Sequence, residues 1–114
     1  MKYYYAVEVI RVVDGDTVDV QIDLGFNVWH KCRVRMVGIN APESRTRDKE
    51  EKKRGLAAKD WLANQFYTEA NIELHSKGKG KFGRVLGEFY IDDININQLM
   101  VDKGHAVEYY GGKR

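Results

Sequence analysis

Four short stretches of this chain concentrate oxygen donors, arginines and aromatic rings, which are the side chains that phosphate chemistry uses. They are Asp14-Gly15-Asp16-Thr17, the segment 34–43, Lys81-Phe82-Gly83-Arg84 and the region from Gly104 to Tyr110. Hard divalent cations such as Ca²⁺ prefer oxygen ligands, and planar guanidinium groups match the geometry of phosphate oxygens. Together the stretches predict a site that binds a metal ion and a phosphate ester.

The candidate metal ligands come from two of these stretches. Asp16 offers a carboxylate, Asn40 offers an amide oxygen, and Ala41 offers a backbone carbonyl just before a rigid proline. We expect these three residues to bind the metal ion, because carboxylate, amide and carbonyl oxygens all suit Ca²⁺. Glu43 follows closely enough to act through a water molecule and not on the metal itself.

Two arginines are candidates to hold the phosphate group. A phosphodiester under in-line attack accumulates negative charge on its non-bridging oxygens, and we expect Arg35 and Arg84 to stabilise that charge. Lys81 ends a basic run that would attract a polyanion, and Phe82 beside it carries a ring that can stack on a base.

Hydrophobic patterning predicts the elements that must position these residues. β-Branched and aromatic residues, or strict alternation, predict strands at 5–13, 17–24, 28–39, 72–75 and 85–91. Apolar residues at helical spacing, including Leu56, Ala57, Trp61 and Leu62, predict a helix from about Glu50 to Phe66.

Two further segments complete this pattern. Asn97 is expected to N-cap a second helix that stops at Gly104, and the stretch 76–83, with its three glycines and three lysines, is expected to be a mobile basic loop. This order of elements predicts a mainly β, α+β fold, a five-stranded Greek-key barrel of the OB type with two helices. A different five-stranded α+β arrangement stays open on pattern alone.

The blocks DGDT, VRMVGINAPE and KFGR and the final tyrosines resemble the staphylococcal nuclease (thermonuclease) family, in order and separation, over essentially the whole chain. The resemblance implies one OB-fold nuclease domain over residues 1–114 that requires Ca²⁺. It implies hydrolysis of single-stranded DNA and RNA at the 5′ P–O bond, leaving 3′-phosphate ends. It also implies that Glu43 is the general base and that Tyr110, or alternatively Tyr109, contacts phosphate or base. Asp14 and Thr17 are candidates to support the metal ligands.

The chain departs from the family pattern in three places. Asn40 stands where the best-known members have an aspartate, which removes one negative charge from the expected metal site. Gly80 stands where an aspartate often precedes the basic block. The sequence stops soon after Tyr110, so we expect the C-terminal helix of the longer members to be absent.

Each block also has a plainer interpretation. Asp14 and Asp16 suit a hairpin turn for backbone reasons alone, Glu43 suits the first turn of a helix, and Arg35 suits a solvated strand edge. The mixed-charge run 45–54 is expected to be a solvated loop and helix face. The one cysteine, Cys32, excludes an internal disulfide and is expected to be a small buried hydrophobe.

Composition restricts the remaining classes of function. A chain of 114 residues suffices for one modest core, and no apolar run reaches membrane-spanning length. The net charge of +2 does not by itself require a nucleic-acid partner. The first residues lack the apolar core of a signal peptide, so we expect no export and a cytoplasmic location by default.

Two rival functions stay open beside the nuclease. One is a non-catalytic OB-fold module that binds single strands, and the other is a scaffolding domain with the same fold. A module that only binds has no reason to keep Asp16, Glu43 and both Arg35 and Arg84 together, so their joint presence favours catalysis.

Overall fold

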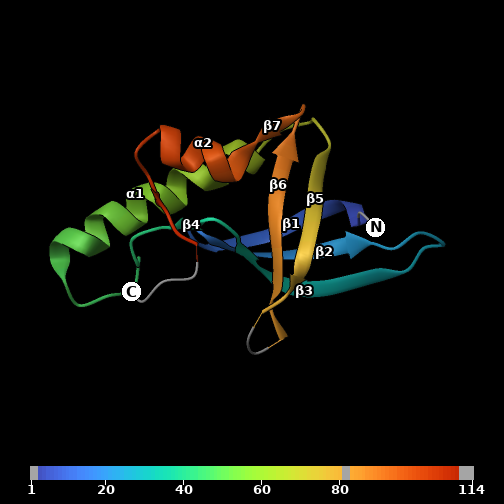
Figure 1. Ribbon diagram of the computed structural model, residues 1–114, viewed down its shortest axis with the longest axis horizontal. Coiled ribbons are helices and arrows are strands. Elements are labelled where there is room, and N and C mark those ends of the chain that lie inside the picture. The colour runs from blue at the N-terminus through green and yellow to red at the C-terminus, as the bar shows by residue number, and fades with distance from the viewer. Residues whose placement is uncertain (1–2, 81–82, 111–114) are drawn as a thin grey trace.

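A closed β-barrel with two helices forms the framework of the protein (Figure 1). The structure, a computed structural model, describes residues 3–80 and 83–110. Its elements are β1 (Tyr3–Asp14), β2 (Thr17–Asp23), β3 (Trp29–Met36), β4 (Ile39–Asn40), α1 (Lys49–Phe66), β5 (Ile72–Lys79), β6 (Val85–Ile91), β7 (Ile94–Asn95), α2 (Ile96–Asp102) and β8 (Val107–Glu108).

Strand pairing closes the barrel. The main sheet has the order β3-β2-β1-β5-β6-β7, and β3 also pairs in parallel with β6. The five strands β1, β2, β3, β5 and β6 therefore form a barrel, which confirms the predicted OB-type α+β fold. The short strands β4 and β8 pair separately, and no helix among the described residues is long and apolar enough to span a membrane.

The strand boundaries lie near the predicted ones, except at β1, at the third predicted strand and at β5. β1 begins already at Tyr3, and the third predicted strand divides into β3 and β4 around Gly38, whose φ of +80° only glycine adopts readily. The predicted alternation of β2 holds, since Val18, Val20 and Ile22 all point into the core.

The barrel interior is apolar, and α1 packs on it. The largest fully buried side chains are Phe89, Met36, Leu62, Leu74 and Met100. Phe66 at the end of α1 meets Phe89 edge-on, with ring centroids 5.1 Å apart. Cys32 is partly buried against this core, and burial raises the pKa of its thiol.

The buried face of α1 differs from the predicted stripe. Its buried residues are Gly55, Ala58, Leu62 and Phe66, whereas Leu56 is 42% exposed. Gly55 faces the backbone of the preceding loop so closely that an added Cβ would lie 2.3 Å from the carbonyl oxygen of Glu43. The rotation of the helix is therefore set by a close backbone approach, which apolar periodicity does not register.

The predicted loop at 76–83 is wrong for its first half, because β5 continues to Lys79. Lys79 pairs with Val85 of β6, and a register shift between Ser76 and Gly78 absorbs an irregularity at Gly78, whose φ is +119°. Glycine content suggested a loop, but pairing with β6 keeps the strand intact. The sequence expectations for Lys81 and Phe82 fall outside the described residues.

The predicted N-cap of the second helix is also wrong. Asn95, not Asn97, caps α2 by accepting a hydrogen bond from the Gln98 N–H at 3.1 Å. Asn97 is 3% exposed, and its side chain binds backbone groups instead. Its amide donates to the carbonyl oxygens of Val37 and Gly87 at 2.9 and 3.1 Å, which ties the segment after β3 to β6.

Candidate active site

Asp16 is the buried carboxylate on which the site is centred. It lies in the turn between β1 and β2 and is 6% exposed. Its Oδ1 accepts a hydrogen bond from the Thr17 hydroxyl and its Oδ2 accepts one from the Ala41 N–H, each at 2.9 Å. The Asp16 carbonyl accepts a further bond from the Met36 N–H at 2.8 Å. This residue therefore joins the first turn to the segment after β3.

The same turn fixes the segment that carries Glu43. Asp14 Oδ1 accepts hydrogen bonds from both the backbone N–H and the hydroxyl of Ser44. From the other side, Gly55 of α1 lies against the Glu43–Ser44 peptide, and the Glu43 N–H donates to Glu51 Oε2 at 3.1 Å. The backbone of Glu43 is thus held between the turn and the helix, while its side chain is exposed.

Arg35 of β3 brings several oxygens of the site to one point. Its Nη1 donates to the Met36 carbonyl oxygen at 2.6 Å. Its Nη2 donates to the Ile39 carbonyl oxygen at 2.9 Å and to Asn40 Oδ1 at 3.3 Å. The Asp16 Oδ2 lies 3.6 Å from the same Nη2. A carbonyl, an amide oxygen and a carboxylate therefore converge around one cationic nitrogen.

This convergence bears on the predicted metal ligands. Asp16 and Asn40 come together, and a carboxylate and an amide oxygen are ligands that suit a hard cation. In this structure Arg35 Nη2 contacts Asn40 Oδ1 at 3.3 Å and lies 3.6 Å from Asp16 Oδ2. The Ala41 backbone is fixed through its N–H to Asp16, whereas ligation by its carbonyl stays a prediction. Within residues 3–80 and 83–110, no cluster of three or more His, Cys, Asp or Glu side chains is placed to hold a metal ion, and the predicted set contains one such side chain.

A pocket of about 420 Å³ brings together all three predicted catalytic residues, Arg35, Glu43 and Arg84. Its lining residues come from the first turn, from β3, from the segment before α1 and from the residue before β6: Asp14, Asp16, Thr17, Arg35, Ala41, Glu43, Arg45 and Arg84. Sequence reasoning assigned Arg45 to a solvated mixed-charge run, and nothing in that run distinguishes it from the neighbouring arginines. Ser44, which anchors Asp14, was also missed.

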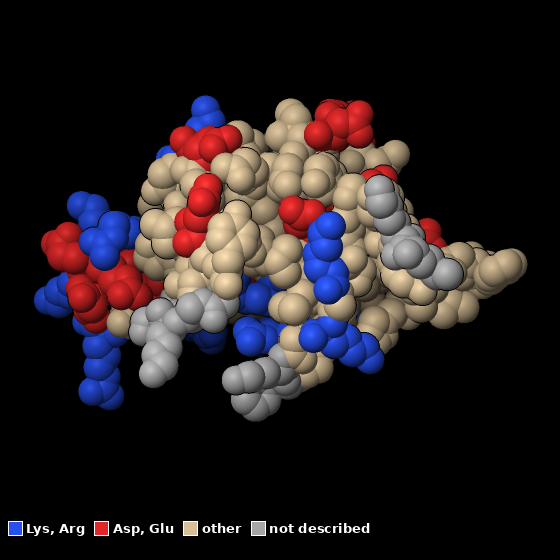
Figure 2. Space-filling model, viewed as in Figure 1, with Lys and Arg blue, Asp and Glu red and all other residues tan. Residues whose placement is uncertain are grey.

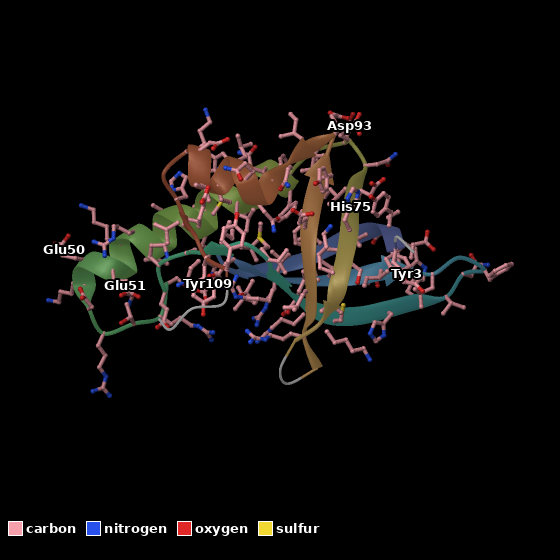
Figure 3. The ribbon with its side chains drawn as sticks, viewed as in Figure 1. Tyr3, Glu50, Glu51, His75, Asp93 and Tyr109 are labelled. Carbon is pink, nitrogen blue, oxygen red and sulfur yellow. The ribbon has the colours of Figure 1, made fainter. Side chains whose placement is uncertain are left out.

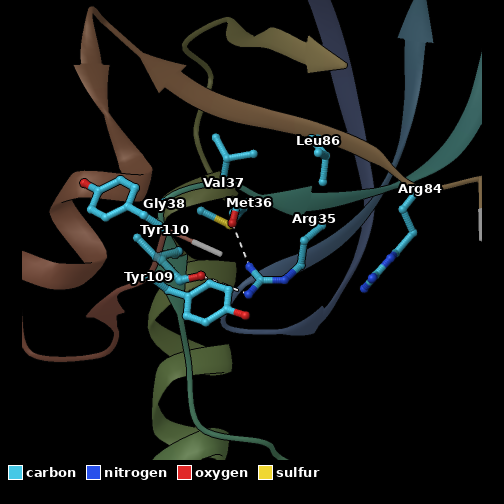
Figure 4. A pocket seen from close by; sticks show the side chains of 9 residues that line it. Arg35, Met36, Val37, Gly38, Arg84, Leu86, Tyr109 and Tyr110 are labelled. Atoms are coloured by element: carbon cyan, nitrogen blue, oxygen red, sulfur yellow. Dashed lines mark hydrogen bonds between the residues drawn. The ribbon is translucent and has the colours of Figure 1, made fainter. Parts of the chain in front are cut away.

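A second pocket, of about 540 Å³, shares the two arginines with the first (Figure 4). It is lined by Arg35 and Arg84 together with Gly38, Leu86 and both final tyrosines. The Tyr109 N–H donates to the Gly38 carbonyl oxygen at 2.9 Å, and its ring lies beside the Arg35 guanidinium. Tyr110 is 82% exposed at the pocket edge. We refer to this hollow as the tyrosine pocket.

Other aromatic and basic residues lie away from these pockets. Tyr4 stacks on His75 at 3.6 Å between centroids, and His75 stacks on Tyr90 at 4.0 Å. Figure 3 shows His75 and Tyr3 well separated from Tyr109. Lys77 pairs with Glu88 of β6, with 3.3 Å between Nζ and Oε1.

Charge is distributed unevenly over the face shown in Figure 2. In Figure 2 acidic side chains gather at the upper right, near the turn between β6 and β7, and Lys and Arg lie over the lower part of the barrel, whereas side chains of both signs mix over the first turns of α1 at the left. Two of the acidic residues, Asp92 and Asp93, form the turn that precedes β7.

Comparison with known proteins gives consistent relatives. The family model "Staphylococcal nuclease homologue" matches residues 33–114. The chain is 32% identical to Protein ParB of Escherichia coli and 32% identical to micrococcal nuclease of Shigella flexneri, over 90% and 91% of its length. It is 28% identical to thermonuclease of Staphylococcus hyicus over 87% of its length. The aligned part spans 56%, 59% and 56% of these three relatives, a little over half of each.

Proposed function

The chain belongs to the staphylococcal nuclease homologue family, and from this premise we propose that it is a metal-dependent phosphodiesterase that cleaves nucleic acid. The observation that carries the proposal is the meeting of Glu43, Arg35 and Arg84 in one pocket beside the Asp16 oxygens. A module that only bound nucleic acid would need the arginines, but it would not need an exposed carboxylate in the same pocket, because that carboxylate repels phosphate.

Ca²⁺ is the metal we propose, held by Asp16 and Asn40 with the Ala41 carbonyl. When bound, Ca²⁺ would supply Lewis-acid stabilisation of charge on the phosphate oxygens. Arg35 contacts Asn40 Oδ1 and lies near Asp16 Oδ2, so its guanidinium links the metal ligands to the phosphate position. One carboxylate among three ligands predicts weak binding of the cation to the protein alone.

Glu43 acts as the general base in this proposal. Its backbone is fixed by Asp14 through Ser44 and by α1, so its carboxylate can be held at a defined place in the pocket. It takes a proton from the attacking water, while Arg35 and Arg84 bind the non-bridging oxygens, on which charge builds up. The water oxygen then forms a bond to phosphorus as the bond from phosphorus to the 5′ oxygen breaks. The 5′ oxygen leaves with the electron pair and takes a proton from solvent water, and the other fragment keeps a 3′-phosphate end.

The tyrosine pocket supports a single-stranded substrate, DNA or RNA. An unpaired base can stack on an aromatic ring, and Tyr109 and Tyr110 offer two rings next to the phosphate-binding arginines. We favour Tyr109 over Tyr110 for this contact, because the ring of Tyr109 lies beside Arg35, whereas Tyr110 is at the edge. Lys81 and Phe82 are proposed to add charge and stacking next to Arg84.

The proposal is tested by incubating end-labelled single-stranded DNA and RNA with the protein in Ca²⁺ or in EDTA and analysing the ends. We expect cleavage with Ca²⁺, none with EDTA, and 3′-phosphate products. Equal cutting in EDTA would contradict the metal assignment, and 5′-phosphate products would contradict the bond assignment. Tight binding without cleavage in either condition would support the non-catalytic single-strand-binding module instead.

A further inference from the structure

We propose that a third pocket, a groove that runs from the candidate active site along β3, binds the backbone of single-stranded nucleic acid beyond the reacting phosphate. This inference rests on the proposed function. We call it the β3 groove, and it has a volume of about 660 Å³. Its charged or ionisable lining residues, among those that the structure describes, are Asp14, His30, Lys31, Arg33, Arg45 and Arg84. Four cationic side chains thus face one acidic side chain.

The groove exists because half of β3 has only one neighbouring strand. β3 pairs with β2 along its whole length, from Trp29 to Arg35. With β6 it pairs only at Val34, Arg35 and Met36. The first part of β3 therefore leaves the barrel as the free edge of a long hairpin with β2, which extends past β5 and β6 in Figure 1. The open edge exposes the basic side chains of this half.

The basic side chains on β3 repeat regularly. Lys31, Arg33 and Arg35 alternate along β3, and its pairing with β2 has no register shift over this stretch. Alternate residues lie on one face at intervals of roughly 6.6 Å. A row of cations with this repeat suits an extended chain that carries one phosphate per nucleotide. An isolated anion would need only one of them.

Asp19 holds the Arg33 side chain in place but does not neutralise the positive charge around it. Arg33 Nε and Nη2 donate to the two oxygens of Asp19 at 2.8 and 3.2 Å. Arg11 donates to the same carboxylate at 3.2 Å. Two guanidinium groups therefore share one carboxylate, and the cluster keeps a net charge of +1.

The β3 groove is continuous with the catalytic pocket. Asp14, Thr17, Arg45 and Arg84 line both, and Arg84 also lines the tyrosine pocket. A strand whose reacting phosphate lies between Arg35 and Arg84 can therefore continue in two directions. On one side the tyrosines take a base, and on the other side the basic residues of β3 take the backbone. Added nucleotides should then raise the affinity of the substrate only where they lie along β3.

The test measures binding of two labelled oligonucleotides, a dinucleotide and an octanucleotide, by fluorescence anisotropy in EDTA over a range of salt concentrations. The variant is Lys31→Gln/Arg33→Gln. The matched control is Lys52→Gln/Lys53→Gln, which removes the same charge from two exposed residues of α1 outside all three pockets. Circular dichroism and thermal unfolding check that each variant is folded.

For the octanucleotide, loss of two contacts should flatten the slope of log affinity against log salt by about 1.4, which is about 0.7 per contact for a single strand. At about 0.1 M salt this corresponds to roughly fivefold weaker binding per contact. The dinucleotide should lose less than about twofold, since it spans only the phosphate position and the tyrosine pocket. Lys31→Gln alone, which leaves Arg33 and Asp19 intact, should change the slope by about 0.7.

Several outcomes would overturn the groove. Equal losses for both lengths, or in the α1 control, would mean that the lysine and arginine act only through the overall field of the protein. An unchanged slope, or an octanucleotide that binds the unaltered chain no better than the dinucleotide, would also reject it. The readout needs no cleavage, so the proposed function and the groove can fail separately. If the variant loses affinity for the octanucleotide but not for the dinucleotide, and the protein never cleaves nucleic acid, the groove proposal holds and the nuclease proposal is wrong.

Discussion

Two carboxylates three residues apart, one in the turn before β2 and one on β2, show what distinguishes the candidate site from the rest of the surface. Asp16 is buried at the end of the barrel, where it accepts hydrogen bonds from the Thr17 hydroxyl and the Ala41 N–H and lies 3.6 Å from Arg35. Asp19 lies on the outer face of the same strand and accepts hydrogen bonds from Arg11 and Arg33. Both are aspartates that face arginines.

The partners of the two carboxylates separate their roles. Asp19 meets two exposed, long side chains, and such pairs contribute at most about 1 kcal/mol to stability. Asp16 meets groups fixed by the backbone, and Arg35 in turn binds the carbonyls of the segment that follows. Proximity of opposite charges is common to both clusters. Of these two clusters, only the one around Asp16 gathers fixed oxygens from distant parts of the chain, and for this reason we assign the proposed chemistry to it.

The largest expected effect is on catalysis. Glu43→Gln, Arg35→Ala and Arg84→Ala should each lower kcat by about two orders of magnitude or more, because each removes proton transfer or charge stabilisation in the transition state. Arg11→Ala is the matched control, since it removes a guanidinium from the Asp19 cluster and should leave the rate near wild type. Rates are measured on single-stranded DNA with Ca²⁺. Near-wild-type rates in folded Glu43 and arginine variants would show that these are ordinary surface residues.

The next largest effect is on stability, where the two aspartates should differ. Asp16→Asn puts an amide where both oxygens now accept hydrogen bonds, so one donor at the turn loses its acceptor, at a cost of about 1–3 kcal/mol. Asp19→Asn should cost about 1 kcal/mol or less, because both of its partners are partly solvated. Urea unfolding of the two variants gives both values. Equal losses would mean that Asp16 is no better fixed than Asp19.

Sequence patterns predicted the barrel, and most of the candidate site residues that they named line one pocket, because both depend on residue type at fixed spacing. The alternation in β2 follows from one face being packed in the core, and Asp16, Arg35 and Arg84 were found by their chemistry. The patterns failed where backbone contacts decide the structure. Gly55 is the clearest case, because a Cβ added at this position would lie only 2.3 Å from the Glu43 carbonyl oxygen.

The other errors have the same origin. Asn95 and Asn97 are equally suitable caps by type, and only the buried bonds of Asn97 to Val37 and Gly87 decide which of them begins α2. Arg45 and Ser44 escaped notice because an exposed arginine and a serine carry no signal until the fold places them beside Asp14 and the pocket. Local sequence therefore predicts the chemistry better than it predicts the supports around it.

A smaller effect concerns the cation itself. Asn40→Asp restores a carboxylate beside Asp16 and should tighten Ca²⁺ binding by about tenfold, or roughly 1.4 kcal/mol. Part of this gain is offset, because the new carboxylate also attracts Arg35 Nη2, which lies 3.3 Å from Asn40 Oδ1. Asn64→Asp on the exposed face of α1 is the control for added charge.

Calorimetric titration with Ca²⁺ measures this effect with and without a non-cleavable substrate analogue. The gain should be larger for the protein alone, because substrate phosphate oxygens supply part of the coordination when they are present. If Asn40→Asp changes neither affinity, residue 40 is not a ligand.

The smallest expected effect is the pH dependence of the contribution that Asp19 makes to the free energy of unfolding. The hydrogen bond from Arg33 lowers the pKa of Asp19 below its ordinary value of 3.8. A carboxylate whose pKa is lower in the folded state stabilises the fold above the unfolded pKa and loses that contribution as pH falls through the folded pKa. The difference in unfolding free energy between wild type and Asp19→Asn should therefore be about 1 kcal/mol or less at pH 7 and should shrink below about pH 4. Urea unfolding at both pH values measures this difference, with Asp60→Asn on α1 as the control.

In an Arg33→Gln background the pH dependence should weaken, because the hydrogen bond that contributes most to the lowered pKa of Asp19 is removed. If the difference in unfolding free energy between wild type and Asp19→Asn stays the same in acid, it must come from packing or strand geometry and not from the charge of Asp19. Asp19 would then contribute to stability through fixed contacts, as Asp16 does.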